Sequence, residues 1–210
     1  MLLHWLLSLQ LLVQLSESRQ NVANMRNSKE GRIEELLLEG RMYGDNYSPG
    51  NFLSGLLTFL TQHVPEDSIA CEIGSFRGKS SELFALHVKT LFCVDLWTPY
   101  SVEYDDTVVN KAEAEFDLMR ENYQNIVKLK SDSVDAALMF PNNFFDLIYV
   151  DADHDETPFR KDMTAWIPKV KMGGIISGHD YFFVRDYLRS FHRDQGIMVF
   201  EDESWFFIKK

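Results

Sequence analysis

Apolar runs that end in ionisable residues constrain the fold of this chain more than any other feature of its sequence. The run at residues 145–150 leads into Asp151 and His154, and a Gly-Gly-Ile-Ile-Ser-Gly run leads into His179 and Asp180. An apolar run of this length between turn residues is typical of a buried strand in a parallel sheet. Ligands of open α/β sheets bind outside the carboxyl ends of the strands. We therefore expect these four ionisable groups to lie where chemistry can occur.

Strand-like and helix-like segments alternate over most of the chain. We expect strands at residues 68–73, 90–94, 126–129, 145–150, 174–177, 197–200 and 205–208. We expect helices at residues 31–40, 52–60, 79–88, 108–123, 133–139, 158–166 and 183–191. This pattern predicts an α/β fold with N-terminal helices and a Rossmann-like, doubly wound, mostly parallel seven-stranded sheet. A short acidic turn joins the last two strands and predicts a C-terminal antiparallel hairpin, because a parallel crossover needs about a dozen residues.

The charge and the cysteines exclude several classes of protein. A formal net charge of -11 disfavours binding to nucleic acid, which requires basic patches. Cys71 and Cys93 each lie inside an expected strand, so we predict two buried thiols rather than a disulfide. The cysteine spacing does not match a structural zinc site.

The apolar segment Leu2 to Leu15 is open to two interpretations. It is short for a membrane span, Gln10 and Gln14 interrupt it, and only the terminal amine and His4 precede it where a signal peptide needs cations. We favour an amphipathic helix that packs on the body of the protein or on a second subunit of a homodimer. A targeting or membrane-surface role is the alternative. We expect a cytoplasmic protein without an integral membrane span.

The segment from Cys71 to Ser80 has the glycines of a ligand-binding turn. Gly74 lets the backbone turn sharply and approach a ligand. Gly78 lies near a helix start, where free N–H groups favour a polar or anionic group. The segment lacks the second close glycine of the dinucleotide fingerprint, and Ile73 stands where a Walker loop needs glycine. A tight turn without a ligand is the alternative.

Polar residues also end the second and third expected strands. Asp95 follows Gly74 by about twenty residues, where a carboxylate can accept hydrogen bonds from both hydroxyls of a ribose. Ser131 and Asp132 are within reach of an adenine edge, and Ser133 is a candidate helix N-cap.

Five motifs in order resemble those of the class I S-adenosylmethionine-dependent methyltransferases. They are Glu-x-Gly-x-x-x-Gly-x-Ser, Val-Asp, Ser-Asp-Ser, Asp-Ala-Asp-His and Gly-Gly-Ile-Ile-x-Gly-His-Asp-Tyr, within about residues 68–210. Within that class the chain looks most like the small-molecule O-methyltransferases that include metal-dependent macrolide sugar methyltransferases. The resemblance implies a methyltransferase domain at residues 63–210, and we interpret residues 1–62 as a helical lid or dimerisation extension.

The resemblance also implies S-adenosylmethionine as the cofactor. Glu72 and Gly74 would line its methionine part, Asp95 would hold the ribose, and Asp132 with Ser131 would lie beside the adenine. The whole predicted cofactor site is Glu72, Gly74, Ser75, Gly78, Ser80, Asp95, Ser131, Asp132 and Asp151.

Asp151 and Asp180 end strands that should be neighbours, so their carboxylates can converge on a divalent cation such as Mg²⁺. In the sugar methyltransferases this pair holds an ion together with a third acidic residue, and His179 stands at that third position here. Histidine shifts the preference towards softer ions such as Mn²⁺, Fe²⁺ or Zn²⁺. The predicted metal ligands are Asp151, His179 and Asp180, and a site without metal is the alternative.

His154 is the predicted general base, with Asp151 as the second catalytic residue. An imidazole is a suitable base near pH 7 for a hydroxyl proton, and the family has its catalytic histidine at this position. Capping of the next helix is the alternative role for His154. The candidate walls of the acceptor pocket are Phe52, Tyr100, Tyr104, Tyr181 and Phe182.

The sequence thus predicts a methyltransferase that acts on a hydroxyl of a small molecule such as a sugar or natural product. A nicotinamide-dependent oxidoreductase is one alternative, and the missing middle glycine argues against it. A non-catalytic binding module with a methyltransferase fold is the other. The presence of Glu72, Gly74, Asp95, Asp151 and His154 argues against that module.

Overall fold

The computed structural model describes residues 28–42, 53–99, 101–102, 104–191 and 196–210. The apolar segment at residues 2–15 lies outside these described residues, as do Phe52 and Tyr100. Within the described part, no helix combines the length and apolar character that a membrane span requires.

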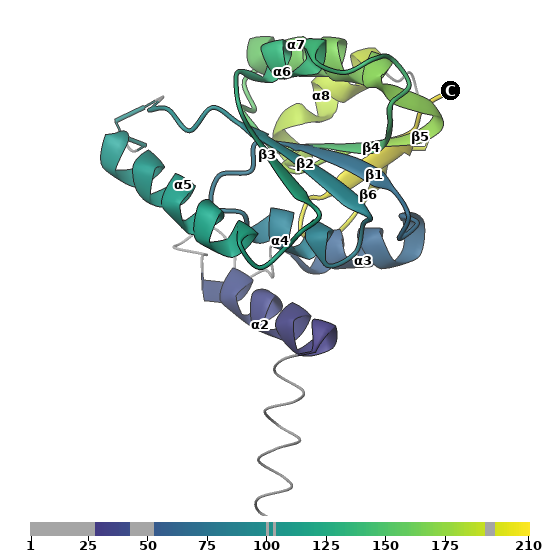
Figure 1. Cartoon of the computed structure of the whole chain (residues 1–210). Coiled ribbons are helices and arrows are strands. Elements are labelled where there is room, and N and C mark those ends of the chain that lie inside the picture. Colours follow the sequence, from purple (N-terminus) through teal and green to yellow (C-terminus); the bar gives the residue numbers. More distant parts are fainter. Residues whose placement is uncertain (1–27, 43–52, 100, 103, 192–195) are drawn as a thin grey trace, which may run out of the picture.

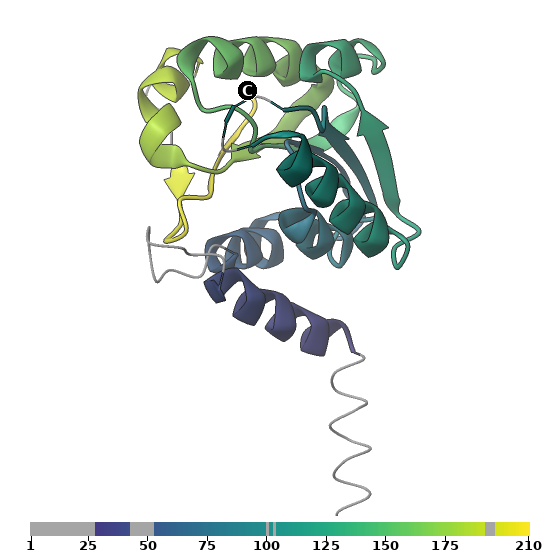
Figure 2. The ribbon, with the colours of Figure 1, turned by 90° about the vertical axis from the view of Figure 1, so that its left-hand side faces the viewer.

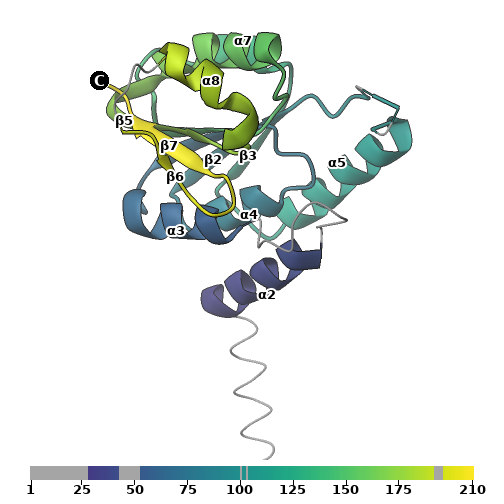
Figure 3. The same cartoon turned by 180° about the vertical axis from the view of Figure 1, so that it is seen from behind.

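A seven-stranded sheet forms the centre of the structure, which confirms the predicted fold class (Figure 1). The strands are β1 (Ile69–Ile73), β2 (Thr90–Asp95), β3 (Ile126–Lys130), β4 (Phe145–Val150), β5 (Val170–Gly178), β6 (Met198–Val199) and β7 (Trp205–Ile208). Their order is β3-β2-β1-β4-β5-β7-β6. The first five strands pair in parallel, and the β6–β7 hairpin adds two antiparallel strands beside β5 (Figure 3).

The observed β5 begins at Val170 rather than at residue 174, where the sequence pattern started it. The strand passes a register shift opposite Phe145 and Leu147. A Cβ at Gly174 would come within 2.8 Å of the carbonyl oxygen of Asp146, so this close approach requires glycine. Glycines usually interrupt a strand pattern, which is why the sequence alone shortened this one.

Helices cover both faces of the sheet. They are α2 (Lys29–Met42), α3 (Ser54–His63), α4 (Lys79–Ala85), α5 (Asp106–Arg120), α6 (Ser133–Leu138), α7 (Glu156–Trp166) and α8 (Tyr181–Phe191), with a 3-10 turn η1 (Ile167–Lys169). Helices α6, α7 and α8 lie on one face, and α3, α4 and α5 lie on the other (Figure 1). Helix α2 lies outside this second layer, as the turned view shows (Figure 2).

The apolar core has one part on each face of the sheet, because successive side chains of a strand point to opposite faces. In β4, Tyr149 packs with one part and Ile148 with the other. Leu36 of α2 and Leu60 of α3 are fully buried in the same part as Tyr149. The N-terminal helices therefore share the core of the sheet. Both cysteines are buried free thiols, as predicted.

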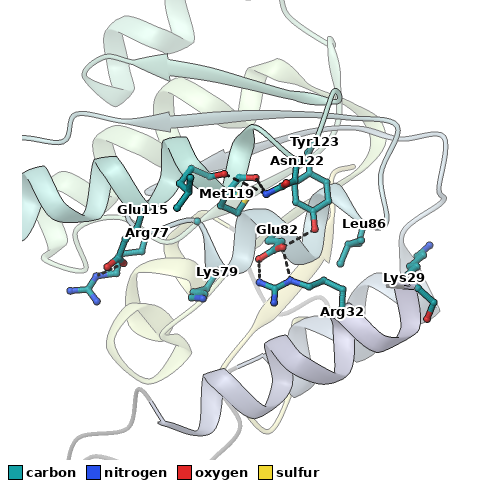
Figure 4. Close-up of a pocket in the computed structure, with 13 residues that line it drawn as sticks. Lys29, Arg32, Arg77, Lys79, Glu82, Leu86, Glu115, Met119, Asn122 and Tyr123 are labelled. Atoms are coloured by element: carbon teal, nitrogen blue, oxygen red, sulfur yellow. Dashed lines mark hydrogen bonds and ion pairs between the residues drawn. The ribbon is translucent and has the colours of Figure 1, made fainter. Parts of the chain in front are cut away.

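A buried carboxylate attaches α2 to the rest of the structure. Glu82 in α4 accepts hydrogen bonds from Arg32 Nε at 2.8 Å and Arg32 Nη2 at 2.7 Å, and from the Tyr123 hydroxyl at 2.7 Å (Figure 4). Only 5% of the Glu82 side chain is exposed. Two parallel bonds between a guanidinium and a carboxylate fix both distance and orientation.

A cavity of about 760 Å³ lies around this contact, between α2, α4 and α5 (Figure 4). Its four lining cations are each paired with a carboxylate: Lys29 with Glu66, Arg32 with Glu82, Arg77 with Glu115 and Lys79 with Glu39. The cations are thus compensated locally, so the lining gives no reason to expect an anionic ligand.

The Arg32 contact leads to a prediction about stability. The Arg32→Ala variant should lose about 2 to 3 kcal/mol of unfolding free energy, because it leaves the buried Glu82 carboxylate without its cation. Lys29→Ala removes an exposed ion pair from the same helix and should cost under about 0.5 kcal/mol. Urea unfolding of both variants measures the difference, and equal losses would contradict this role of Glu82.

Candidate active site

The carboxyl ends of the parallel strands meet at one edge of the sheet. Ile73 lies beside both Val94 and Val150, and Val150 lies beside Gly178. The segments after β1, β2, β4 and β5 therefore leave the sheet next to one another. Trp205 pairs with Gly178, so the turn between β6 and β7 reaches the same edge from the opposite direction.

Gly74 permits the closest backbone approach at this edge. Its φ is +92°, and its N–H donates to the Val94 carbonyl at 2.8 Å. A Cβ at this position would lie 2.2 Å from the carbonyl oxygen of Asp151. Only glycine combines this φ with this proximity. The loop after β1 is thus held against the chain that carries Asp151.

Glu72 is fully buried, and its carboxylate is bound by two serines of the following helix. Ser80 Oγ donates to one carboxylate oxygen and Ser81 Oγ to the other. Burial raises the pKa of Glu72 to about 7, although these hydrogen bonds act in the opposite direction. Glu72 therefore holds the start of α4, and its side chain is shielded from solvent. Ser75 is also buried.

Asp95 connects three loops at the end of β2. Its Oδ2 accepts the Phe76 N–H at 2.9 Å, and its Oδ1 accepts the Trp97 N–H at 2.7 Å. Its carbonyl accepts the Ser131 N–H at 3.0 Å. Each carboxylate oxygen has more than one acceptor position, so both retain capacity for a hydroxyl donor. This donor and acceptor set fits the ribose of a nucleoside.

Asp132 is the N-cap of α6, because its side chain accepts the N–H groups of Val134 and Asp135. Ser133, the other candidate for this cap, instead accepts the indole N–H of Trp166 at 2.9 Å. Asp132 is exposed and Ser131 is half-buried beside Asp95. Gly78 lies at the start of α4, with φ +81°.

The four ionisable groups that follow β4 and β5 form one cluster. His154 Nε2 is hydrogen-bonded to Asp180 Oδ2. His179 Nδ1 lies 3.3 Å from Asp180 Oδ2 and 3.9 Å from Asp151 Oδ1. Ligand atoms of Asp151, His154 and Asp180 all lie within 4.8 Å of one another. The fold thus brings together Asp151 and Asp180, which are 29 positions apart in the chain, as the strand pattern predicts.

The charges in this cluster are coupled. Burial raises the pKa of Asp151, and the neighbouring Asp180 adds to the effect. Burial also opposes the charge on Asp180, but its hydrogen bond with His179 holds the pKa of Asp180 below its usual value. Burial lowers the pKa of His179, and the hydrogen bond to Asp180 with the charge of Asp151 outweighs this and raises it to about 9.

These charges bear on the predicted metal ligands. A protonated imidazole has no lone pair for a metal, so a cation would first have to displace the proton of His179. His154 is better placed than His179 to supply a nitrogen ligand, because its ring nitrogen lies in one compact group with carboxylate oxygens of Asp151 and Asp180. Two carboxylates and one imidazole fit a divalent cation that accepts mixed oxygen and nitrogen ligands.

Two features of this edge had no clear signal in the sequence. The turn between β6 and β7 binds the start of α3, because Asp202 Oδ2 accepts the Leu56 N–H at 2.8 Å. Trp97 closes the loop around Asp95, and its indole N–H donates to the Phe76 carbonyl at 2.8 Å. Both contacts join residues far apart in the chain, which local patterns do not reveal.

The sheet is mostly parallel with an antiparallel hairpin, a glycine turn follows β1, and an acidic residue ends β2, which is the arrangement of a class I methyltransferase. Residues 71–181, more than half of the chain, match the family model described as a methyltransferase domain. The chain belongs to this methyltransferase family.

Individual relatives are distant. A candidate caffeoyl-CoA O-methyltransferase from Staphylococcus aureus superimposes with a TM-score of 0.60 at 14% identity, over 92% of this chain and 99% of that one. A candidate methyltransferase from Streptococcus mutans, solved with S-adenosylhomocysteine, gives 0.52 at 11%, over 72% and 92%. At these identities the likeness shows the fold alone.

One curated relative matches at the level of sequence. It is an uncharacterised protein of Acanthamoeba polyphaga mimivirus, 27% identical over 120 residues, which are 55% of this chain. The matched part spans about half, 52%, of that relative's length.

The raised pKa of Glu72 predicts a pH dependence of stability. Between its ordinary value of 4.5 and about 7, the folded chain binds a proton here that the unfolded chain does not. The wild type should therefore lose stability relative to Glu72→Gln as the pH rises through this window, by up to about 1.4 kcal/mol per unit of pKa shift. Urea unfolding across this range measures it, with the exposed Glu66→Gln as control. If the difference in unfolding free energy between the wild type and Glu72→Gln did not change with pH, the raised pKa of Glu72 would be contradicted.

Proposed function

We propose that this chain transfers the methyl group of S-adenosylmethionine to a hydroxyl of a small polyhydroxylated acceptor, such as a sugar or a natural product. The observation that carries the proposal is the hydrogen-bonded pair of His154 and Asp180, at the carboxyl edge of the sheet, where open α/β sheets bind their ligands. A paired histidine at this position is suited to removing a hydroxyl proton. The candidate O-methyltransferase among the structural neighbours is consistent with oxygen as the acceptor atom.

The cofactor supplies an electrophilic methyl group on a sulfonium. Asp95 would accept hydrogen bonds from the ribose hydroxyls with the lone pairs that Phe76 and Trp97 leave free. Gly74 would give the methionine part access to the backbone after β1, and Ser131 with Asp132 would border the adenine. Positioning of the donor and the acceptor would supply most of the acceleration.

His154 would act as the general base, and Asp180 would orient it. With a proton on Nε2 donated to Asp180, the lone pair of the imidazole is on Nδ1, which then takes the acceptor proton. The carboxylate of Asp180 stabilises the imidazolium that forms. Asp151 lies in the same compact group as this pair.

A divalent cation is compatible with the same cluster. Asp151 and Asp180 would hold it, with His154 or His179 as the nitrogen ligand. The ion would polarise an acceptor hydroxyl and lower its pKa. The residues fit such an ion by type and by proximity, and the fit favours Mn²⁺ or another cation of intermediate softness over Mg²⁺.

The N-terminal helices are proposed to form part of the acceptor side. The first turn of α3 is bound by Asp202, in the turn that also reaches the strand edge. Tyr181 and Phe182 begin α8 directly after Asp180, and 57% of Phe182 is exposed. These positions suit a wall for an acceptor, and a homodimer through the N-terminal region remains part of the proposal.

Cofactor binding is the first test. Calorimetry with S-adenosylhomocysteine should give micromolar to millimolar affinity, and Asp95→Ala should weaken it by about tenfold or more through the loss of charge-assisted hydrogen bonds. No binding by the wild type at millimolar ligand would refute the proposal. Binding of NADH instead, followed by its fluorescence, would favour an oxidoreductase.

Methyl transfer to a panel of hydroxylated acceptors, followed with a labelled methyl donor, is the second test. His154→Ala should reduce kcat by about 100-fold or more while leaving the affinity for S-adenosylhomocysteine unchanged. The matched control is His87→Gln, two residues after the end of α4, where Nε2 of His87 lies 2.7 Å from the Val64 carbonyl oxygen. Full activity of His154→Ala would exclude His154 as the general base. If the wild type binds the cofactor but methylates no acceptor, a non-catalytic binding module is favoured instead.

The metal is tested separately through thermal stability. Mn²⁺ should raise the melting temperature of the wild type but not of Asp180→Ala, because a ligand that binds only the folded state stabilises it by an amount that grows with the logarithm of ligand concentration over Kd. His154→Ala and His179→Ala then show which imidazole contributes. An equal rise in Asp180→Ala would exclude this cluster as the site.

A further inference from the structure

Two bulky residues at the strand edge have a left-handed backbone. Phe76, after β1, has φ +42°, and Trp97, after β2, has φ +44°. This region is disfavoured for residues other than glycine, asparagine and aspartate, and such residues cluster at ligand sites where the surrounding structure holds them. The two residues are 21 positions apart in the chain and are bound to each other.

Phe76, Trp97 and Asp95 form a closed set of three hydrogen bonds, in which each residue is bonded to the other two. Phe76 N–H donates to Asp95 Oδ2 at 2.9 Å, and Trp97 N–H donates to Asp95 Oδ1 at 2.7 Å. The indole N–H of Trp97 donates to the Phe76 carbonyl at 2.8 Å. Each carboxylate oxygen thus has one backbone donor, and the plane of the carboxylate is set by both loops together.

The position of Trp97 is in turn set by the layer beneath it. Only 3% of Trp97 is exposed, and its ring centroid lies 4.9 Å from that of Phe116 in α5. The Lys128 ammonium lies 4.6 Å from the same indole ring, held by Glu113 and Asp117. A cation over an aromatic face is attracted by the ring, so residues of both β3 and α5 hold the indole in place.

We propose that Trp97 is the positioning residue of the nucleoside subsite, with Phe76 as its partner. Trp97 holds Phe76 in the conformation in which its N–H reaches Asp95, and so presents the free lone pairs of Asp95 to a ribose. The inference rests on the proposed function, in which Asp95 binds the cofactor ribose. It adds that the strained loop pair, rather than Asp95 alone, determines affinity for the ribose hydroxyls.

The test measures the contribution of a ribose hydroxyl in the full chain. Calorimetry compares the binding of S-adenosylhomocysteine with that of its 2′-deoxy analogue. We define the hydroxyl penalty as the Kd of the deoxy analogue divided by the Kd of S-adenosylhomocysteine. Trp97→Phe keeps an aromatic ring but removes the indole N–H. It should weaken S-adenosylhomocysteine binding by about three- to tenfold, the loss expected for one hydrogen bond, and the deoxy analogue by less. The hydroxyl penalty therefore shrinks.

Trp166→Phe is the matched control. Trp166 is buried like Trp97, and its replacement likewise removes a single indole hydrogen bond, to Ser133 Oγ. Its melting temperature should fall like that of Trp97→Phe, but its hydroxyl penalty should equal that of the wild type. A role of Trp97 in stability alone would leave the penalty unchanged in both variants.

Lys128→Met is a second variant, which keeps Trp97 and removes the cation above it. It should reduce the hydroxyl penalty in the same direction by a smaller factor, and it replaces Trp97→Phe if that variant does not fold. An unchanged penalty, or an equal loss of affinity for both ligands, overturns the inference. A wild type that binds neither ligand instead refutes the proposed function, on which the inference depends.

Discussion

The structure depends on the close packing of backbone at the carboxyl ends of β1, β4 and β5. At Gly74 a Cβ would lie 2.2 Å from the Asp151 carbonyl oxygen, and at Gly178 a Cβ would lie 2.3 Å from the Val150 carbonyl oxygen. Any side chain at these positions would push the loops apart. Because Gly74 and Gly178 have no Cβ, the segments after β1 and β5 can turn at this edge close to the end of β4. The short distances among Asp151, His154, His179 and Asp180 depend on that close approach.

Acidic residues serve two purposes here, and burial separates them. Glu72, Glu82 and Asp202 are buried, and each binds donors from another segment: the serines of α4, Arg32 of α2 or the first turn of α3. Asp95, Asp151 and Asp180 are only partly buried and lie at the strand edge. The first group joins elements to one another, and the second group retains free acceptor capacity. The proposed chemistry depends on the second group.

Much of the fold could be predicted because it depends on local patterns. Apolar runs placed the strands, and β4 was predicted with its observed ends, 145–150. β5 was predicted too short, because the register shift and the packing of Gly174 against Asp146 depend on a neighbouring strand. The convergence of Asp151, His154, His179 and Asp180 was predictable, since parallel neighbours end at the same edge. Their roles as base, orienting group or metal ligands stay predictions.

The sequence by itself determined the order of strands and helices, the glycine turn and the types of residue at the edge, since each is encoded within a few neighbouring positions. Only the tertiary structure decided which of these groups are buried and which bind one another. It buried Glu72 under two serines, paired His154 with Asp180, and closed Phe76 and Trp97 around Asp95. These outcomes depend on distances between residues remote in the chain, and those distances exist only after the sheet has brought the strand ends together.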